Sequence, residues 1–440
     1  MNPSREAQSR REEEVRRIFT RTAESYERVV NLATLGMDKM WKERMIGICR
    51  TRLKSPGKIL DLACGTGLLT YRLAALYPDS TIVGLDIMPE YLERARSKAD
   101  LSNRSRILFR LHNADELESA DLKKFGQFDL IITSYLPKYV DVSKLATTCH
   151  ALLAPHGVLM VQGRIVVNGT ANKPAIFSAF DENGAAAGWQ GIVLMGSGKK
   201  NLIEHCRVEG AETGLDASFS NVTLKNAFFG RCRTGVRMQD SLAVMSGSAF
   251  GECGSGLVLY DCEADIRSAD FYGNRLGIFA ARSSLALSDS RLSGNNLLAL
   301  KADSCRLGIS GNGFIANGSG LCLVASEGAV TANRIAQSAA YGLILTQSRV
   351  KVSANDIERN SRVGLLVEDG KGVAWGNLLF ANGGYDLYNG GTEDFRAIGN
   401  WWGGAVADPA GRIYDRNLDD RRGRVLYLPI LQTRPLPVAP

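Results

Sequence analysis

The sequence lacks the features that define several classes of protein. Its nine cysteines show no Cys-x-x-Cys spacing, which argues against a zinc site. No apolar run approaches the length of a membrane span, and Met1 to Arg17 is rich in Arg and Glu instead of forming a signal peptide. The net charge of +7 is mild, and no basic stripe with interleaved aromatics predicts nucleic-acid binding. These absences predict a soluble, cytoplasmic protein with free thiols, no metal, no nucleic-acid partner and no membrane span.

The part of the chain up to about residue 161 alternates between strand-like and helix-like segments. A chain of 440 residues allows two or three domains, and 45% hydrophobic residues is a globular value. Strands are expected at Lys58–Leu62, Thr81–Leu85, Ile107–His112, Phe128–Thr133 and Gly157–Val161, and helices at Thr70–Leu76, Pro89–Ala99 and Ser143–Leu153. This alternation predicts an α/β domain with a parallel, Rossmann-like sheet.

One stretch, Ile59 to Gly67, carries the strongest functional signal. It runs from an apolar strand into a glycine turn at Gly65 and Gly67, where the backbone can approach a ligand closely. Asp86 follows about 20 residues later at the end of the next strand, where an acid can hold ribose hydroxyls. The turn also begins with Asp61, whose carboxylate could order the loop or meet a ligand ammonium group. This combination suits S-adenosylmethionine, which has a ribose and a charged amino acid but no pyrophosphate.

A wider set of motifs resembles the ubiquinone/menaquinone biosynthesis C-methyltransferases, from about residue 14 to residue 161. The residues that carry the resemblance are Ala23-x-x-Tyr26, Asn31, Gly36, Trp41-Lys42, Leu60-Asp61-Leu62-Ala63-x-Gly65-Thr66-Gly67-x-x-Thr70, Asp86, Asn113-Ala114 and Ser134. The resemblance implies S-adenosylmethionine contacts at Thr70, Asp86, Asn113, Ala114 and Ser134. It also implies that Asp86 holds the ribose and that Asn113 and Ala114 lie near the adenine.

The sequence departs from the family pattern in two respects that bear on the methyl acceptor and its chemistry. After Ser134 the sequence reads Tyr135-Leu136-Pro137-Lys138-Tyr139, unlike the run that the quinone enzymes have. No spacing identifies a dedicated base, although Asp115, Glu116 and Asp129 supply carboxylates, so the catalytic residues stay unknown. Methyl transfer tolerates this, because much of the catalysis can come from holding the reacting groups in line.

The pattern changes abruptly near residue 160. Methyltransferases of this kind need a further helix and an antiparallel strand pair after the fifth strand, and neither is readable here. The sheet is therefore expected to be incomplete. The predicted domains are a methyltransferase-like domain over residues 1–161, a repeat domain over 163–404, and a C-terminal cap with a loose tail over 405–440.

The repeat domain shows a period of about 21 residues in three files of positions. The glycine file is Gly214, Gly235, Gly256, Gly277, Gly320, Gly342 and Gly364, with Leu298 standing in for a missing glycine and Tyr385 at the next place. The apolar file is Phe228, Phe250, Phe271, Leu292, Phe314, Ile335, Ile357 and Leu379, and the polar file is Cys232, Cys253, Asn274, Asn295, Asn317, Asn360 and Asn382. Short strands, three to a coil, with stacked Asn side chains predict a parallel β-helix. The run resembles the right-handed parallel β-helix repeat family, and Trp401 and Trp402 are expected to cap its core.

The β-helix shows no cluster of catalytic carboxylates. Its acids appear scattered near turns, at Asp216, Asp240, Asp261, Asp289, Asp303 and Asp369. A binding or scaffold role, with a glycan or a protein as candidate ligand, is therefore favoured over chemistry.

Two functional hypotheses remain open. The first is an S-adenosylmethionine-dependent methyltransferase, acting on a quinone-like or other small acceptor, fused to a β-helix. The second is a non-enzymatic β-helix scaffold with a degenerate methyltransferase remnant, joined to it by a gene fusion.

Overall fold

The computed structural model describes residues 37–100, 103–114, 125–134, 151–162, 165–178, 189–196, 200–404 and 409–435, with residues 32, 117, 136, 145, 148 and 149. Two compact units divide the chain. The first contains the residues up to Cys206 together with Leu215–Asn221, and the second contains Arg207–Gly214 and the residues from Val222 onward. No helix among the described residues is both long enough and apolar enough to cross a membrane.

The first unit is built on a parallel sheet whose strand order is β3-β2-β1-β4-β5-β8. Its strands are β1 (Lys58–Leu62), β2 (Thr81–Asp86), β3 (Ile107–Leu111), β4 (Phe128–Ser134), β5 (Leu153–Gln162) and β8 (Gly191–Met195), and its helices are α3 (Met37–Arg52), α4 (Leu68–Leu76) and α5 (Pro89–Ser97). The predicted α/β alternation is therefore confirmed. The helix expected up to Leu153 ends earlier, because Leu153 already pairs with Phe128 of β4.

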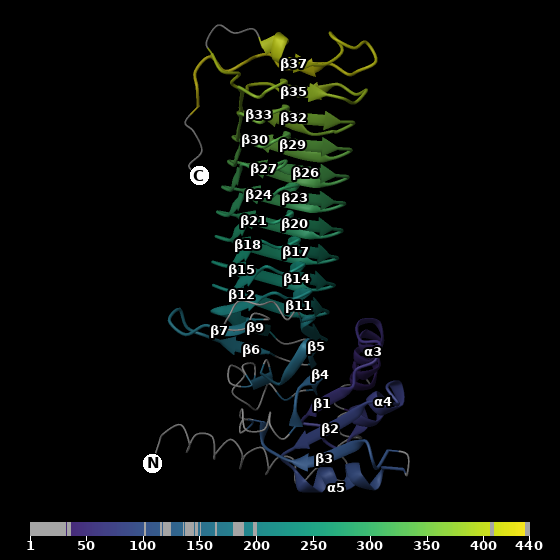
Figure 1. Ribbon diagram of the computed structural model, residues 1–440. Helices are drawn as coiled ribbons and strands as arrows, with labels where there is room; N and C mark the ends of the chain where they lie inside the picture. Colours follow the sequence, from purple (N-terminus) through teal and green to yellow (C-terminus); the bar gives the residue numbers. More distant parts are fainter. Residues whose placement is uncertain are drawn as a thin grey trace. The chain divides into compact units, whose positions relative to one another are not determined.

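The three helices of the described part of this unit pack against one face of the sheet (Figure 1). The shared core contains Met45 from α3, Leu73 from α4 and Leu92 from α5, all fully buried. Alternate strand residues point to the same face because side chains alternate across a strand. Val193 and Met195 of β8 belong to this core as well, so a strand from beyond residue 163 contributes to the packing of the α/β unit.

The sheet continues past β5 through β8, which pairs with β5 in parallel from Val158↔Gly191 to Gln162↔Met195. Residues Leu215 to Ser218 pair with β8 in turn. The position beyond the fifth strand is thus taken by strands of the repeat region. The remaining strands of this part are β6 (Val166–Asn168), β7 (Ala175–Ser178), β9 (Lys200–Glu204) and β11 (Thr213–Ser218).

The second unit is a parallel β-helix in which three strands form each coil, as predicted (Figure 1). One column contains β14 (Thr234–Gln239), β17 (Ser255–Tyr260), β20 (Leu276–Ala281), β23 (Leu298–Asp303), β26 (Leu321–Val324), β29 (Tyr341–Thr346), β32 (Val363–Glu368), β35 (Tyr385–Asn389) and β37 (Ile413–Tyr414). A second contains β12 (Asn221–Lys225), β15 (Leu242–Ser246), β18 (Glu263–Arg267), β21 (Ser284–Ser288), β24 (Arg306–Ser310), β27 (Glu327–Thr331), β30 (Arg349–Ser353), β33 (Val373–Trp375), β36 (Phe395–Arg396) and β38 (Val425–Leu426). A third contains β10 (Cys206–Glu209), β13 (Phe228–Gly230), β16 (Ala249–Gly251), β19 (Asp270–Tyr272), β22 (Arg291–Ser293), β25 (Gly313–Ile315), β28 (Arg334–Ala336), β31 (Asp356–Glu358) and β34 (Leu378–Phe380), and a short 3-10 helix, η3, spans Pro409–Arg412.

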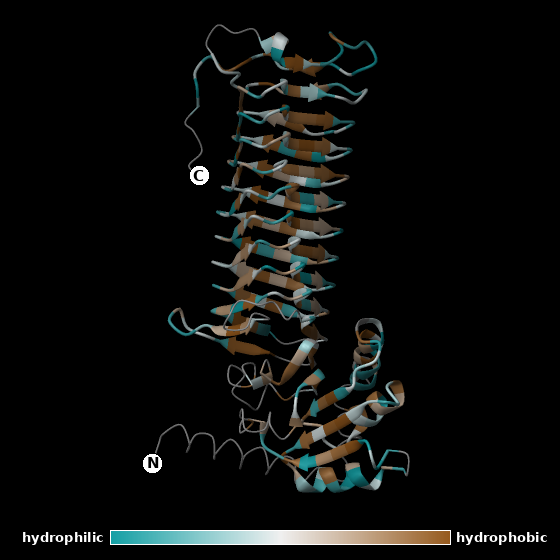
Figure 2. Cartoon of the chain, in the orientation of Figure 1, coloured by the Kyte–Doolittle hydropathy of each residue, from teal (hydrophilic) through white to brown (hydrophobic). Residues whose placement is uncertain are grey.

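Alternation within these short strands builds the core of the coils. The buried side chains of the coils are mostly apolar. Figure 2 shows the strands of the coils mostly in brown and the turns between them mostly in teal or white. The apolar file forms stacked rings, such as Phe250 on Phe271 with centroids 4.5 Å apart. Phe229, not Phe228 as predicted, begins this file, because Phe229 pairs with Phe250 and is fully buried.

The glycine file also needs a one-residue correction at two places. Leu298 pairs with Leu276, so Ala299 is the residue that takes the place of a glycine. Likewise Tyr385 pairs with Val363, which leaves Asp386 in line with Gly364. The file requires small residues because a Cβ on Gly277 would lie 2.4 Å from the Ala299 carbonyl oxygen.

Three ladders of buried polar side chains run from coil to coil at the turns. The predicted Asn file forms one of them. In it the backbone N–H and the side-chain Nδ2 of Asn295 both donate to Asn317 Oδ1 at 2.9 Å. A second Asn ladder was missed by the sequence analysis and contains Asn312, Asn333, Asn355, Asn377 and Asn400. The third ladder consists of Ser and Cys side chains at Cys262, Ser283, Cys305, Ser326 and Ser348. Each ladder residue satisfies backbone groups that burial would otherwise leave without a partner.

Candidate cofactor-binding site

The turn between β1 and α4 brings two glycines into the left-handed region, with φ of 56° at Gly65 and 79° at Gly67. The two have different surroundings. A Cβ on Gly67 would lie 3.1 to 3.2 Å from the rings of Tyr71 and Phe109, so this glycine permits close packing at the start of α4. A Cβ on Gly65 would meet no atom of the described residues within 4 Å. The open space that a ligand needs is therefore beside Gly65.

Asp86 ties the turn to the end of β2. Its carboxylate accepts hydrogen bonds from the Gly65 backbone N–H at 2.8 Å and from the Met88 backbone N–H at 2.9 Å. The side chain is only 7% exposed. Burial raises the pKa of Asp86, and the hydrogen bonds from Met88 and Gly65 act in the opposite direction. Asp86 thus positions the glycine turn and keeps acceptor capacity on both oxygens.

Asp61 is a second buried carboxyl group in the same region. It is 1% exposed, and its Oδ2 accepts a hydrogen bond from Thr70 Oγ1 at 2.7 Å. The pKa of Asp61 is raised to about 7, mainly by burial and also by the nearby Asp86 charge. The Thr70 hydrogen bond and the Lys42 charge act in the opposite direction. Lys42 itself forms an ion pair with Asp38.

The site therefore combines two buried acids with an open space at Gly65. The two carboxyl groups supply hydrogen-bond acceptors and, when ionised, negative charge. Such a set suits a ligand that carries hydroxyl or ammonium donors and a positive charge, because a cation nearby favours the ionised carboxylates.

The other predicted residues lie at the same edge of the sheet. Asn113 and Ala114 follow β3, whose end adjoins β2 through a hydrogen bond from His112 N–H to the Asp86 carbonyl oxygen at 3.0 Å. Ser134 ends β4, directly after Thr133, which pairs with Leu62 of β1. Parallel strands place their carboxyl ends on one edge, so the structure gathers the predicted set there. That set is Asp61, Gly65, Gly67, Thr70, Asp86, Asn113, Ala114 and Ser134.

Several motif residues from the sequence analysis lie outside the described part of the chain. They are Ala23, Tyr26, Asn31, Gly36, Asp115, Glu116, Tyr135, Pro137, Lys138 and Tyr139. Asp129 is described and has a structural role, because its Oδ2 accepts the backbone N–H groups of Gly57 and Lys58 at 2.8 and 2.9 Å.

One contact in the first unit was not predicted. The guanidinium carbon of Arg44, on α3, lies 3.7 Å from the ring centroid of Phe219, which follows β11. No local pattern could have indicated it, since the two residues are far apart in sequence and meet only because β8 and β11 extend the sheet.

The second unit contains an acidic pair that the sequence analysis missed. Asp240, Asp261, Asp289 and Asp369 do lie at turns, where each has a positive φ. Asp356 and Glu358, however, stand two residues apart on β31 and are 2% and 4% exposed. An Asp-x-Glu spacing within a three-residue strand puts both side chains on one face. No group of three or more potential metal ligands occurs among the residues that the structure describes.

Comparison with known proteins assigns the two halves. Residues 53–186 match a model described as a methyltransferase domain, and residues 165–296 and 255–401 match a model described as a right-handed β-helix region. A ubiquinone/menaquinone biosynthesis C-methyltransferase from a Geobacter species is 32% identical over 35% of this chain and 65% of its own length. A demethylmenaquinone methyltransferase from Thermus thermophilus is 31% identical over 33% of this chain and 63% of its own length.

Among solved structures, an S-adenosylmethionine-dependent methyltransferase from Mesorhizobium loti is 28% identical, with a TM-score of 0.21, over 24% of this chain and 45% of that one. The chain spans less than two thirds of the length of the curated methyltransferases that it matches. It therefore carries a methyltransferase domain in its N-terminal part and belongs, over residues 165–401, to the right-handed β-helix family.

Proposed function

We propose that the N-terminal domain is an S-adenosylmethionine-dependent methyltransferase that acts on a quinone-like or other small acceptor. The observation that carries the proposal is the pair of buried carboxyl groups, Asp61 and Asp86, beside the open space at Gly65. The names of the related enzymes, which methylate quinone precursors, support this class of acceptor.

The residues present fit this cofactor. Asp86 has acceptor capacity for ribose hydroxyls, since the backbone N–H groups of Gly65 and Met88 each occupy one lone pair, on Oδ2 and Oδ1 respectively. Asp61, held by Thr70, supplies negative charge toward an ammonium or sulfonium group. When bound, the cofactor supplies an electrophilic methyl group on sulfur. The protein then needs to hold the acceptor in line with that methyl group and to exclude water.

The extension of the sheet edge by β8 supports turnover as opposed to a non-functional remnant. A domain that ended at β5 would leave the ladder groups of that strand and one side of the core without partners. Here β8 pairs with β5 over its carboxyl half, and Val193 and Met195 fill the core. The rest of the β-helix is proposed to serve as a binding or scaffold domain.

The test is calorimetric titration of the full chain with S-adenosylmethionine. We expect saturable binding that Asp86→Ala weakens by at least about tenfold, which corresponds to about 1.4 kcal/mol and to the loss of charge-assisted hydrogen bonds. Asp79→Ala is the matched control, because Asp79 is exposed and lies on the turn that precedes β2.

A second variant, Asp61→Asn, distinguishes the loss of a ligand contact from misfolding, because it keeps the shape of the side chain. It should retain the wild-type circular dichroism and still bind the cofactor more weakly. Absence of any binding heat at millimolar ligand in the folded wild type would exclude the proposal.

A further inference from the structure

Two aromatic side chains form a corner on the outer face of the last coils of the β-helix. Phe380 ends β34, and Trp401 forms a parallel bridge with Leu378 of the same strand. Their ring centroids are 5.0 Å apart, and the ring planes meet at 70°. The two rings therefore offer two walls at nearly a right angle, an arrangement that attracts cations through the ring quadrupoles.

A cation from the C-terminal segment lies in this corner. The guanidinium carbon of Arg434 is 5.3 Å from the centroid of Phe380 and 5.3 Å from that of Trp401. Backbone hydrogen bonds hold the segment nearby, from Gly399 N–H to the Pro429 carbonyl oxygen at 2.6 Å and from Leu431 N–H to the Asn400 carbonyl oxygen at 2.9 Å. Among the described residues, none forms a hydrogen bond or a close ion pair with the Arg434 guanidinium.

An acidic group on the same face has an unused acceptor. Asp356 is 2% exposed, and its Oδ1 has no hydrogen-bond partner among the described residues. Burial raises the pKa of Asp356 and the neighbouring Glu358 raises it further, while the charges of Arg334, Arg434 and Arg359 lower it. Asp356 pairs with Leu378 of β34, and Leu378 forms the bridge to Trp401, so Asp356 lies on the strand next to the one that carries the corner.

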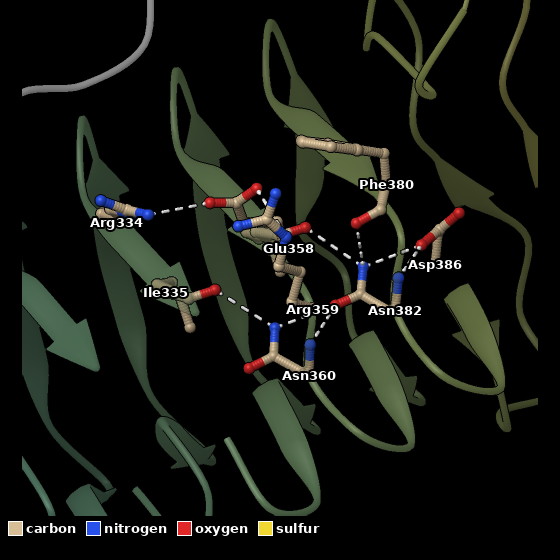
Figure 3. Close-up of polar contacts among 9 residues, drawn as sticks. Arg334, Ile335, Glu358, Arg359, Asn360, Phe380, Asn382 and Asp386 are labelled. Carbon is tan, nitrogen blue, oxygen red and sulfur yellow. Dashed lines mark hydrogen bonds and ion pairs between the residues drawn. The ribbon is translucent and has the colours of Figure 1, made fainter. Parts of the chain in front are cut away.

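Glu358 lies on the same face as Asp356, but its carboxylate already has cationic partners there. Arg334 Nη2 donates to Glu358 Oε1 at 3.1 Å, and Arg359 Nε lies 3.9 Å from Glu358 Oε2. Figure 3 shows Arg334, Glu358 and Phe380 along one side of three successive strands, while the Asn360 and Asn382 side chains bond within the ladder. The side-chain amides of Asn360 and Asn382 and the carboxylate of Glu358 therefore have partners, whereas Asp356 Oδ1 has none among the described residues.

We propose that Phe380, Trp401 and Asp356 form a binding site for a guanidinium or alkylammonium group presented by a ligand or partner, and that Arg434 occupies this site in cis. The mismatch of the present occupant carries the inference. Arg434 contacts the two rings, but its five N–H donors have no acceptor among the described residues, and Asp356 Oδ1 is likewise without a partner there. A cation that enters between the rings and reaches the carboxyl group would satisfy both.

Competition within the chain predicts how the site responds. A side chain tethered by a short segment acts at an effective concentration in the millimolar range, so Arg434 masks the site from weak external cations. Removal of the Arg434 side chain should unmask the site without altering the coils, since the segment is held by backbone hydrogen bonds.

The experiment is ligand-observed NMR with Nα-acetyl-arginine amide and, separately, tetramethylammonium, added to the full chain. We expect Arg434→Ala to bind the arginine probe at least about fivefold more tightly than the wild type. Arg421→Ala is the control, because Arg421 is exposed and already paired with Asp419, and it should match the wild type. Equal binding by Arg434→Ala and the wild type, or none by either, would overturn the proposal.

Two further variants, made in the Arg434→Ala background, locate the binding. Phe380→Leu should weaken the arginine probe by about tenfold, because one wall of the corner is lost. Asp356→Asn, which keeps the shape and fold of the site, should weaken it by about threefold. Thermal melts identify variants that fail to fold, and undiminished binding by both folded variants would show that the probe binds elsewhere.

Discussion

The two regions of the molecule bury polar side chains in opposite ways. In the β-helix, Asn333 accepts two hydrogen bonds from Asn312 and donates to Asn355, so each buried amide is satisfied by the coils on either side. In the α/β unit, Asp61 and Asp86 are buried at strand ends, and their pKa values are raised by burial. The first pattern repeats from coil to coil, whereas Asp61 and Asp86 belong to a single site.

This difference gives a rule for interpreting buried polar residues. A repeated, fully bonded residue stabilises the fold, because its hydrogen bonds replace those lost with water. A buried carboxyl group with a raised pKa lowers the stability of the fold at neutral pH. Such groups are typical of ligand sites, where function and not stability explains their presence. Asp356 matches the second pattern, although it lies in a region dominated by the first.

The largest expected effect tests whether the α/β unit needs a strand from the repeat region. Val193→Asp places a charge in the core that β8 shares with α3 and α4, where Val193 is 2% exposed. We expect the α/β unit to lose its cooperative fold, because burial of an unpaired charge costs several kcal/mol. Hydrogen exchange of the β1 and β5 amides measures the loss.

Val244→Asp is the matched control for this substitution. Val244 lies on β15 and is 46% exposed, so the same change should leave hydrogen exchange as in the wild type. If Val193→Asp also preserved wild-type protection of β5, the α/β unit would be independent of β8.

The next effect concerns the pH dependence of the α/β unit. The pKa of Asp61 is raised to about 7 in the folded state, above its unfolded value near 4, so the folded chain binds more protons between these pH values. The free energy of unfolding should therefore fall as pH rises from about 4 to about 7, by up to about 1.4 kcal/mol per pH unit. Asp61→Asn should flatten this slope in urea titrations, and a slope equal to that of the wild type would contradict it.

A smaller effect is expected from the Asn ladder. Asn333→Ala removes the bonds that Asn333 Oδ1 accepts from Asn312 and those that its Nδ2 donates to Ile309 and Asn355, and it should lower the free energy of unfolding of the β-helix by about 2 to 3 kcal/mol. Ser338→Ala is the control, because Ser338 is fully buried but its Oγ has no partner among the described residues. Equal losses in the two variants would show that burial and not hydrogen bonding decides ladder stability.

The smallest effect is expected at the surface of the coils. Arg282 pairs with Asp261 at 2.7 Å, but the side chains are 60% and 36% exposed. Arg282→Ala should leave the unfolding midpoint unchanged, because exposed ion pairs are screened by water and salt. Arg412→Ala should lower the midpoint, since its partner Asp386 is 1% exposed and would be left buried without its cation.

The sequence predicted both folds because each has a strong local signal. The strand at Lys58–Leu62 was predicted with its exact bounds, and the glycine turn and Asp86 meet as expected at the edge of the sheet. The errors in the repeat files, at Phe228, Leu298 and Tyr385, are each of one residue. They arise because some coils have 21 residues and others 22, so spacing leaves an uncertainty of one position that only the strand pairing removes.

The sequence by itself determined what depends on neighbouring residues and on period. Local apolar patterns specify β1 to β5, and the repeat specifies a solenoid with a polar ladder. Only the tertiary structure decided which strand follows β5, that Asp356 is buried without a partner, and that Arg434 lies between Phe380 and Trp401. These relations join residues distant along the chain, and strand pairing and packing, not local propensity, select them.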